Sequence, residues 1–184
     1  MKISQEKKEL AMQYTEENIR GGLNCSESVF NALIRAGILD LPEEATALAS
    51  GVNGGAAATG HTCGAITGAI MALGAVYGSP DPKSEHRTMV KSPNGKNQTN
   101  DPTQDYRYYR MRRFNNLVGD FKKELGTTQC QDIVDRNNGY WNDSRQQECE
   151  HCIRTGVTLA IHYLEMDEEE ANRLPYAENI FQWN

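Results

Sequence analysis

The sequence predicts an all-α fold, and three observations lead to this prediction. In several segments, apolar residues recur every three or four positions, which is the spacing of a buried helical face. These segments begin and end at residues that commonly cap helices, such as asparagine, proline and glycine. No segment of any length alternates polar and apolar residues with period two, so no strand is required. We therefore expect a compact bundle of about six helices in a single domain, residues 1–184.

Cap signals delimit the first three helices. A helix from about residue 5 to residue 20 ends at Gly21 and Gly22, since glycine is the usual residue after a helix C-terminus. Asn24 begins the second helix, and Glu27 three residues later completes the spacing of a capping box. Pro42 opens a short third helix that extends to about residue 49.

A glycine-rich helix from about Thr62 to Tyr77 is expected at the centre of the bundle. Gly64, Gly68 and Ala72 recur in it at every fourth position, so one face lacks bulk and lets another backbone approach closely. Packing within the chain and contact across a homodimer both explain this face.

The second half of the chain is expected to contain a long loop and three further helices. Residues 79–101 are polar, hold three prolines and show no periodicity, which predicts a loop. Asp101 and Pro102 then begin a helix that ends at Gly126. A short helix follows Thr128, and a long one covers about residues 144–166. Residues 167–184 are expected to form a tail without strong pattern.

Charge and hydropathy exclude several function classes. The net charge is −6, so the overall field does not favour nucleic acid or anionic membranes as partners. The first fifteen residues carry charges throughout and contain no apolar stretch of the kind found in export signals. The most apolar stretch, residues 68–76, is too short to cross a bilayer. We expect a cytoplasmic protein that does not insert into membranes and does not bind nucleic acid.

The five cysteines are the main candidates for chemistry. In a reducing compartment, cysteines are more often metal ligands, reactive thiols or buried apolar residues than disulfide partners. Cys25, Cys63 and Cys130 fall in the first turns of predicted helices, where free N–H groups and the helix dipole stabilise a thiolate. Cys149 and Cys152 lie three residues apart on one helix face, so they can form a pair or bind one metal together.

Two histidines and two arginines are secondary candidates. His61 and His151 flank cysteines and are either additional ligands or proton donors, or ordinary surface groups. The run from Tyr106 to Arg113 mixes aromatic and basic residues, which in an acidic protein is usually a solvated helix face. A further hypothesis is that Arg107 and Arg110 face the cysteines and keep their thiolates ionised.

The order of these motifs resembles that of a known family. The sequence is similar, over about residues 10–165, to the redox-active protein family named for its C, GCAxxG, C and C pattern. The residues that carry the resemblance are Asn24-Cys25-Ser26-Glu27-Ser28, Ala49-Ser50-Gly51-Val52-Asn53-Gly54-Gly55, Cys63-Gly64-Ala65-Ile66-Thr67-Gly68, Cys130, and Cys149-Glu150-His151-Cys152-Ile153-Arg154.

The resemblance implies a helical domain with four shared cysteines and a redox or metal role. By position, those four are Cys25, Cys63, Cys130 and Cys149, with Cys152 as an extra thiol. Members are often encoded near transporter genes, which implies a transport component or a redox protein as partner. Similarity of the family to part of the split-Soret cytochromes suggests iron chemistry. Covalent haem is not expected, because Ile153 follows Cys152 where a haem-attachment motif has histidine.

Two functional hypotheses follow from the cysteines. In the first, the protein is redox-active: either Cys25, Cys63, Cys130 and Cys149 bind an iron–sulfur cluster or another metal, or the thiols cycle between dithiol and disulfide. In the thiol version Cys63 is the nucleophile and Cys149 or Cys152 is the resolving thiol. In the second hypothesis, the protein is a non-catalytic helical interaction module associated with a transport system, and its cysteines are structural.

Overall fold

The computed structural model describes residues 1–78 and 106–175, the first five of the second range as helical backbone only. Within these ranges the fold is all-α, as the sequence predicts, and the only strand-like feature is an isolated antiparallel bridge between Thr62 and Gln129. The helices are α1 (Gln5–Arg20), α2 (Cys25–Arg35), the 3₁₀ helix η1 (Glu43–Val52), α3 (Gly64–Tyr77), α4 (Tyr106–Leu125), α5 (Cys130–Arg136), α6 (Asp143–Glu165) and α7 (Glu168–Arg173).

Most predicted helix ends agree with the structure. Asn24 caps α2, and its backbone N–H donates to the Glu27 carboxylate at 2.9 Å, which is half of a capping box. The third predicted helix is present, but as the 3₁₀ helix η1. The predicted loop 79–101, with the cap residues Asp101 and Pro102, lies outside the described residues.

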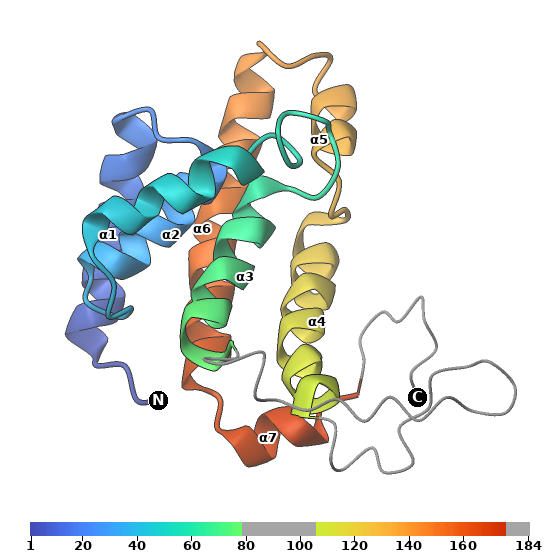
Figure 1. The fold of residues 1–184 in the computed structure, drawn as a ribbon. Coiled ribbons are helices and arrows are strands. Elements are labelled where there is room, and N and C mark those ends of the chain that lie inside the picture. The colour runs from blue at the N-terminus through green and yellow to red at the C-terminus, as the bar shows by residue number, and fades with distance from the viewer. Residues whose placement is uncertain (79–105, 176–184) are drawn as a thin grey trace, which may run out of the picture.

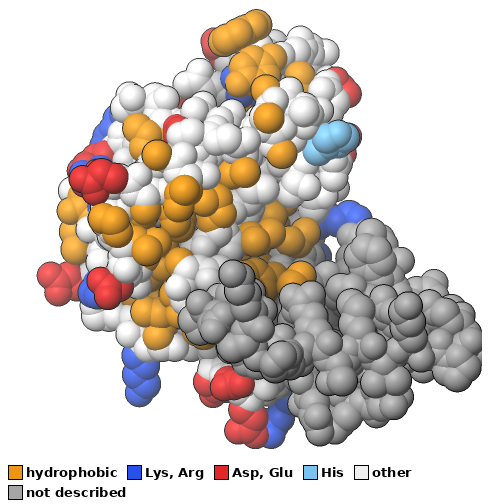
Figure 2. Space-filling view, in the orientation of Figure 1, with side chains coloured by type: hydrophobic (Ala, Val, Ile, Leu, Met, Phe, Trp, Pro, Cys, Tyr) orange, Lys and Arg blue, Asp and Glu red, His pale blue; other side chains and the backbone are white. Residues whose placement is uncertain are grey.

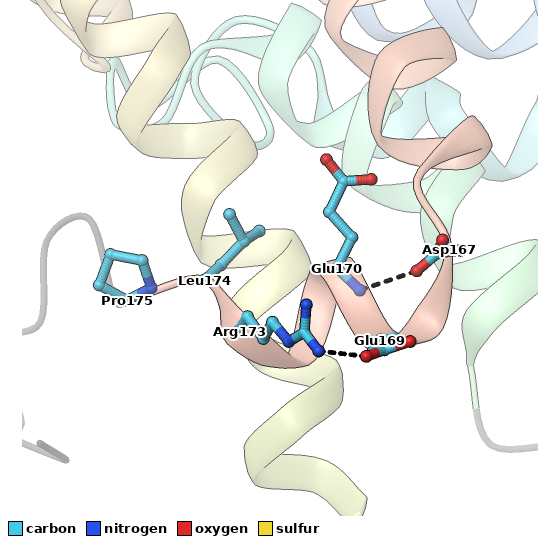
Figure 3. Close-up of a pocket in the computed structure, with 6 residues that line it drawn as sticks. All are labelled: Asp167, Glu169, Glu170, Arg173, Leu174 and Pro175. Carbon is cyan, nitrogen blue, oxygen red and sulfur yellow. Dashed lines mark hydrogen bonds and ion pairs between the residues drawn. The ribbon is translucent and has the colours of Figure 1, made fainter.

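The structure differs from the prediction after residue 167, where it contains the short helix α7. Asp167 caps this helix by accepting a hydrogen bond from the Glu170 backbone N–H at 2.7 Å, and Glu169 pairs with Arg173 one turn later (Figure 3). Only Ala171 of this helix is buried. With so little apolar periodicity, the segment gives no helical signal in the sequence.

Helices α3 and α6 lie side by side in the middle of the bundle, with α1 and α2 on one side and α4 on the other (Figure 1). Helix α2 packs against α1, α3, α6 and η1, and eight of its 11 residues are buried. The largest fully buried apolar side chains come from α2, α3, α4, α5 and α6 and include Val29, Leu33, Ile66, Leu73, Leu117, Phe121, Ile133, Val157 and Leu164.

The surface of the bundle is apolar in places. Figure 2 shows hydrophobic side chains spread over the face that η1 and α3 form, with charged groups mainly at its edges. None of the described helices combines the length and apolar character needed to cross a bilayer.

Two glycines allow the central helices to approach closely. A Cβ atom at Gly68 of α3 would lie 2.6 Å from the Ser26 carbonyl oxygen of α2. A Cβ atom at Gly156 of α6 would lie 2.8 Å from the Ala65 carbonyl oxygen of α3. Both distances are shorter than any van der Waals contact, so only glycine fits at these crossings. Packing within the chain therefore accounts for the small-residue face of α3 without a second copy of the protein.

A buried arginine holds the helices together at the end of the bundle where α6 ends. Arg113 of α4 donates hydrogen bonds to the carbonyl oxygens of Tyr163 and, at 2.7 Å, Met166 at the end of α6. It also donates to the carbonyl oxygen of Asp167, the N-cap of α7, at 3.1 Å. Its guanidinium lies 3.9 Å from the ring centroid of Tyr77 of α3. Arg113 thus ties α3, α4 and α6 together.

Replacing the crossing glycines tests this packing. We expect Gly68→Ala and Gly156→Ala each to lower the free energy of unfolding by about 1–3 kcal/mol, because backbone must move to accept the new methyl group. Denaturant titration followed by circular dichroism measures this change. The matched control is Gly74→Ala in the same helix α3, where a Cβ atom would meet nothing within 4 Å. There we expect stabilisation by up to about 1 kcal/mol, from helix propensity alone. Equal behaviour of all three variants would contradict the packing argument.

Candidate functional site

All five cysteines gather at one end of the bundle, where the starts of α2, α3 and α5 meet the first half of α6 (Figure 1). None of them is in a disulfide. Cys63 is the centre of the group: it is hydrogen-bonded to Cys152, and its charge raises the pKa values of Cys25, Cys130 and Cys149. Thiols from four separate segments therefore share one neighbourhood.

A short backbone pairing places Cys63 beside Cys130. Around the bridge between Thr62 and Gln129, the Cys63 N–H donates to the Thr128 carbonyl at 2.8 Å and the Cys130 N–H donates to the His61 carbonyl at 2.6 Å. Cys63 is the N-cap residue of α3, and Cys130 is the first residue of α5. The pairing therefore joins two helix N-termini, with one thiol at each.

Cys25, the first residue of α2, lies against the backbone of α3. A Cβ atom at Gly64 would be 2.2 Å from the Cys25 Sγ, so the sulfur occupies the space that a side chain at residue 64 would need. Burial raises the pKa of Cys25 to about 11, although a hydrogen bond from the Gly54 backbone lowers it. This thiol is protonated at neutral pH.

The segment that supplies Gly54 has an unusual backbone. All five residues from Gly54 to Ala58 have positive φ, between 51° and 80°, and three of them are alanines. A left-handed conformation costs an alanine about 1 kcal/mol or more, so the surroundings must enforce it. Hydrogen bonds from Gly60 N–H to the Gly54 carbonyl at 3.0 Å and from His61 N–H to the Gly55 carbonyl at 3.1 Å close the loop.

Cys63 and Cys152 form the most buried pair, with 4% and 0% of their surfaces exposed. The hydrogen bond from Cys152 lowers the pKa of Cys63 despite burial, and the backbone amides of Ala65 and Ile66 in the first turn of α3 lower it further. The same hydrogen bond and burial raise the pKa of Cys152. Of the two, Cys63 is therefore the thiol that ionises more readily, and Cys152 is the hydrogen-bond donor.

Cys130 and Cys149 are half-buried thiols around this pair. Burial raises the pKa of Cys130 to about 11. Burial also raises the pKa of Cys149, but the Arg145 guanidinium opposes the rise by donating to the Cys149 Sγ at 3.5 Å. That guanidinium lies 4.2 Å from the ring centroid of Tyr140. Helix α6 therefore supplies both this thiol and its cation.

Sequence analysis missed Arg145. The spacing that could have identified it is its position one helical turn before Cys149, since side chains four residues apart meet on a helix surface. The arginines proposed instead, Arg107 and Arg110, lie outside the residues whose side chains the structure describes.

The two histidines near the cysteines point elsewhere. His61 and His151 are both exposed. The His151 Nε2 lies 4.0 Å from the Glu124 carboxylate of α4, so its neighbour is an exposed acid and not a thiol. Neither imidazole belongs to the cluster of five cysteines.

The cysteines do not form a site for a single metal ion as they stand. Among the described residues, no three Cys, His, Asp or Glu side chains are arranged to hold one. The predicted ligands Cys25, Cys63, Cys130 and Cys149 are therefore not arranged to share one ion. Two surface pockets also lack cysteine: one lies at α7 (Figure 3), and the other lies between α4 and α6.

Comparison with known proteins agrees with the sequence resemblance. A family model described as "Putative redox-active protein (C_GCAxxG_C_C)" matches residues 23–163, a span that includes every cysteine of the chain. No curated protein and no solved structure matches the chain.

The ionisation of Cys63 can be tested by titrating the thiols through their ultraviolet thiolate absorbance. We expect one thiolate to form well below the ordinary thiol pKa of about 8.5, because hydrogen bonds stabilise the Cys63 anion. Two others should form only near pH 11, since Cys25 and Cys130 both have pKa values of about 11.

Cys63→Ser should remove the early step and move the late steps to lower pH, because the charge that opposes ionisation of Cys25 and Cys130 is lost. Cys130→Ser is the control and should retain the early step. Persistence of the early step in Cys63→Ser would show that another thiol carries it.

Proposed function

Because the chain belongs to the C_GCAxxG_C_C family, whose members are described as redox-active, we propose that its function is thiol redox chemistry in which Cys63 and Cys152 cycle between a dithiol and a disulfide. One observation carries this proposal: the two most buried cysteines share a hydrogen bond that lowers the pKa of Cys63 and raises that of Cys152.

This pairing matches the chemical needs of disulfide formation. A disulfide forms when a thiolate attacks a sulfur and a second thiol resolves the intermediate, so one ionised and one protonated thiol in contact are the reactants. Cys63 is the nucleophile because its pKa is lowered, and Cys152 is the resolving thiol. Oxidation of the pair in this state releases two electrons and the Cys152 proton to an acceptor, for which the disulfide of another molecule is suitable.

An iron–sulfur cluster is the second candidate for the same thiols. It is favoured by the gathering of Cys25, Cys130 and Cys149 around Cys63, since cysteine thiolates are the usual ligands of such clusters. It ranks second because no three potential ligands among the described residues are arranged for a metal ion.

The third hypothesis, an interaction module with structural cysteines, needs no ionised thiol. Buried cysteines that only pack have raised pKa values. The lowered pKa of Cys63 is therefore the feature that favours redox chemistry over this reading. A transport component or another redox protein is the partner we propose for exchange of electrons.

The decisive experiment maps the thiols in a redox buffer. Protein purified without oxygen is equilibrated with mixtures of reduced and oxidised glutathione, its free thiols are alkylated, and its disulfides are located by mass spectrometry. We expect two thiols to be lost together and a Cys63–Cys152 disulfide to appear. Cys63→Ser and Cys152→Ser should abolish this step, whereas Cys25→Ser should retain it, because Cys25 packs against Gly64 and not in the pair.

The same preparation separates the other candidates. Stoichiometric iron and sulfide in the purified protein, lost in Cys25→Ser, would favour the cluster. If no two thiols are lost together at any buffer ratio and the protein binds no iron, both redox hypotheses are refuted and the interaction module remains.

A further inference from the structure

The buried pair requires a route to its substrate. Thiol–disulfide exchange needs direct access of one sulfur to another, in line with the bond that breaks. Cys63 and Cys152 have 4% and 0% of their surfaces exposed, so an external disulfide does not reach either sulfur in this structure. A more accessible thiol in contact with the pair would solve this problem.

Three half-buried cysteines surround the pair, and they are not equivalent. The sulfur of Cys25 fills the space beside Gly64, so it faces the backbone of α3 and not solvent. The Arg145 guanidinium acts on Cys130 only through its charge, and burial outweighs this effect. Of these three thiols, and among the residues that the structure describes, only Cys149 receives a hydrogen bond from a cation, the Arg145 guanidinium at 3.5 Å.

The position of Cys149 also connects it to the pair. It lies three residues before Cys152 on α6, which places both thiols on one helix face. The charge of Cys63 also acts on Cys149 and raises its pKa. Arg145 is itself held over the ring of Tyr140, which packs edge-on against the 91% exposed Trp141.

We propose that Cys149 is the thiol that first reacts with an external disulfide and passes the exchange to Cys63 and Cys152, with Arg145 as its positioning residue. This inference rests on the proposed dithiol function of the pair. The substrate class is a disulfide-bonded molecule that reaches α6 from the side of Tyr140 and Trp141.

The exchange proceeds in three displacements. The Cys149 thiolate attacks a disulfide RS–SR, so that a Cys149–SR bond forms and one RS⁻ leaves and takes up a proton. The Cys63 thiolate then attacks the Cys149 sulfur, forming a Cys63–Cys149 bond and expelling the second RS⁻. Cys152 finally loses its proton and attacks the Cys63 sulfur, which releases Cys149 as thiolate. Two electrons and the Cys152 proton have passed from the pair to RSSR, and a second proton, taken up from solvent, completes the two RSH.

The charges that face Cys149 set the pH dependence of the first step. Cys63 on α3 and Glu150 on α6 disfavour its thiolate, and Arg145 favours it. Removing Arg145 therefore shifts the reaction to higher pH, whereas a purely structural role of Arg145 would change the rate equally at every pH.

The test follows the reaction of the fully reduced protein with an aromatic disulfide, dithionitrobenzoate, by stopped-flow absorbance. We expect Cys149→Ser to slow the first phase by about tenfold or more, because the remaining thiols are less accessible or less ionised. The matched variant Cys130→Ser, which also removes a half-buried thiol of this site, should stay within about twofold of wild type. Circular dichroism confirms that each variant is folded.

Three further variants complete the test: one identifies the first bond formed, and two test the role of Arg145. In Cys63→Ser/Cys152→Ser, the mixed disulfide cannot be passed on, and mass spectrometry should locate the adduct on Cys149. Arg145→Gln should raise the pH of half-maximal rate, and Arg145→Lys should restore part of the shift. An adduct mainly on Cys130 or Cys25, or a first phase unchanged by Cys149→Ser, would overturn the inference.

Failure of the Cys149 route can be distinguished from failure of the proposed dithiol function. If a Cys63–Cys152 disulfide forms at equilibrium in glutathione buffer but the adduct is not on Cys149, only the route is wrong. If that disulfide does not form in wild type, the dithiol function itself fails.

Discussion

The site depends on a very short piece of backbone pairing. Residues 60–63 and 128–131 meet at one antiparallel bridge, with the Cys63 and Cys130 amides as donors at 2.8 and 2.6 Å. Without this pairing, α3 and α5 would have no reason to begin at the same place, because a long stretch of chain separates them. Since each helix start offers free N–H groups, the bridge concentrates positive potential where the thiols gather.

As a consequence, the five clustered cysteines differ in how readily they ionise. One thiolate, at Cys63, takes the most favourable position, with a thiol donor on one side and the first turn of α3 on the other. Burial first, and the Cys63 charge after it, raise the pKa values of Cys25, Cys130 and Cys149. Cys63 is therefore the thiol of this neighbourhood that ionises most readily.

The sequence predicted the helical class, the ends of α1 and α2, and the three cysteines at helix starts, because caps and glycine stops are local signals. It also predicted the family, which the match over residues 23–163 confirms. It offered Cys149 or Cys152 as the partner of Cys63 and could not choose between them, since the hydrogen bond with Cys152 depends on the crossing of α3 and α6. The contact between Arg145 and Cys149 was not predicted, although the two residues lie four positions apart on α6. The helix α7 was missed because a single buried alanine leaves no periodic pattern.

The left-handed loop from Gly54 to Ala58 links backbone strain to the state of the thiols. Its three alanines each give up about 1 kcal/mol or more relative to ordinary helical or extended backbone, and the loop directs an amide at Cys25. The loop thus places backbone in a costly conformation in direct hydrogen-bond contact with one of the clustered thiols.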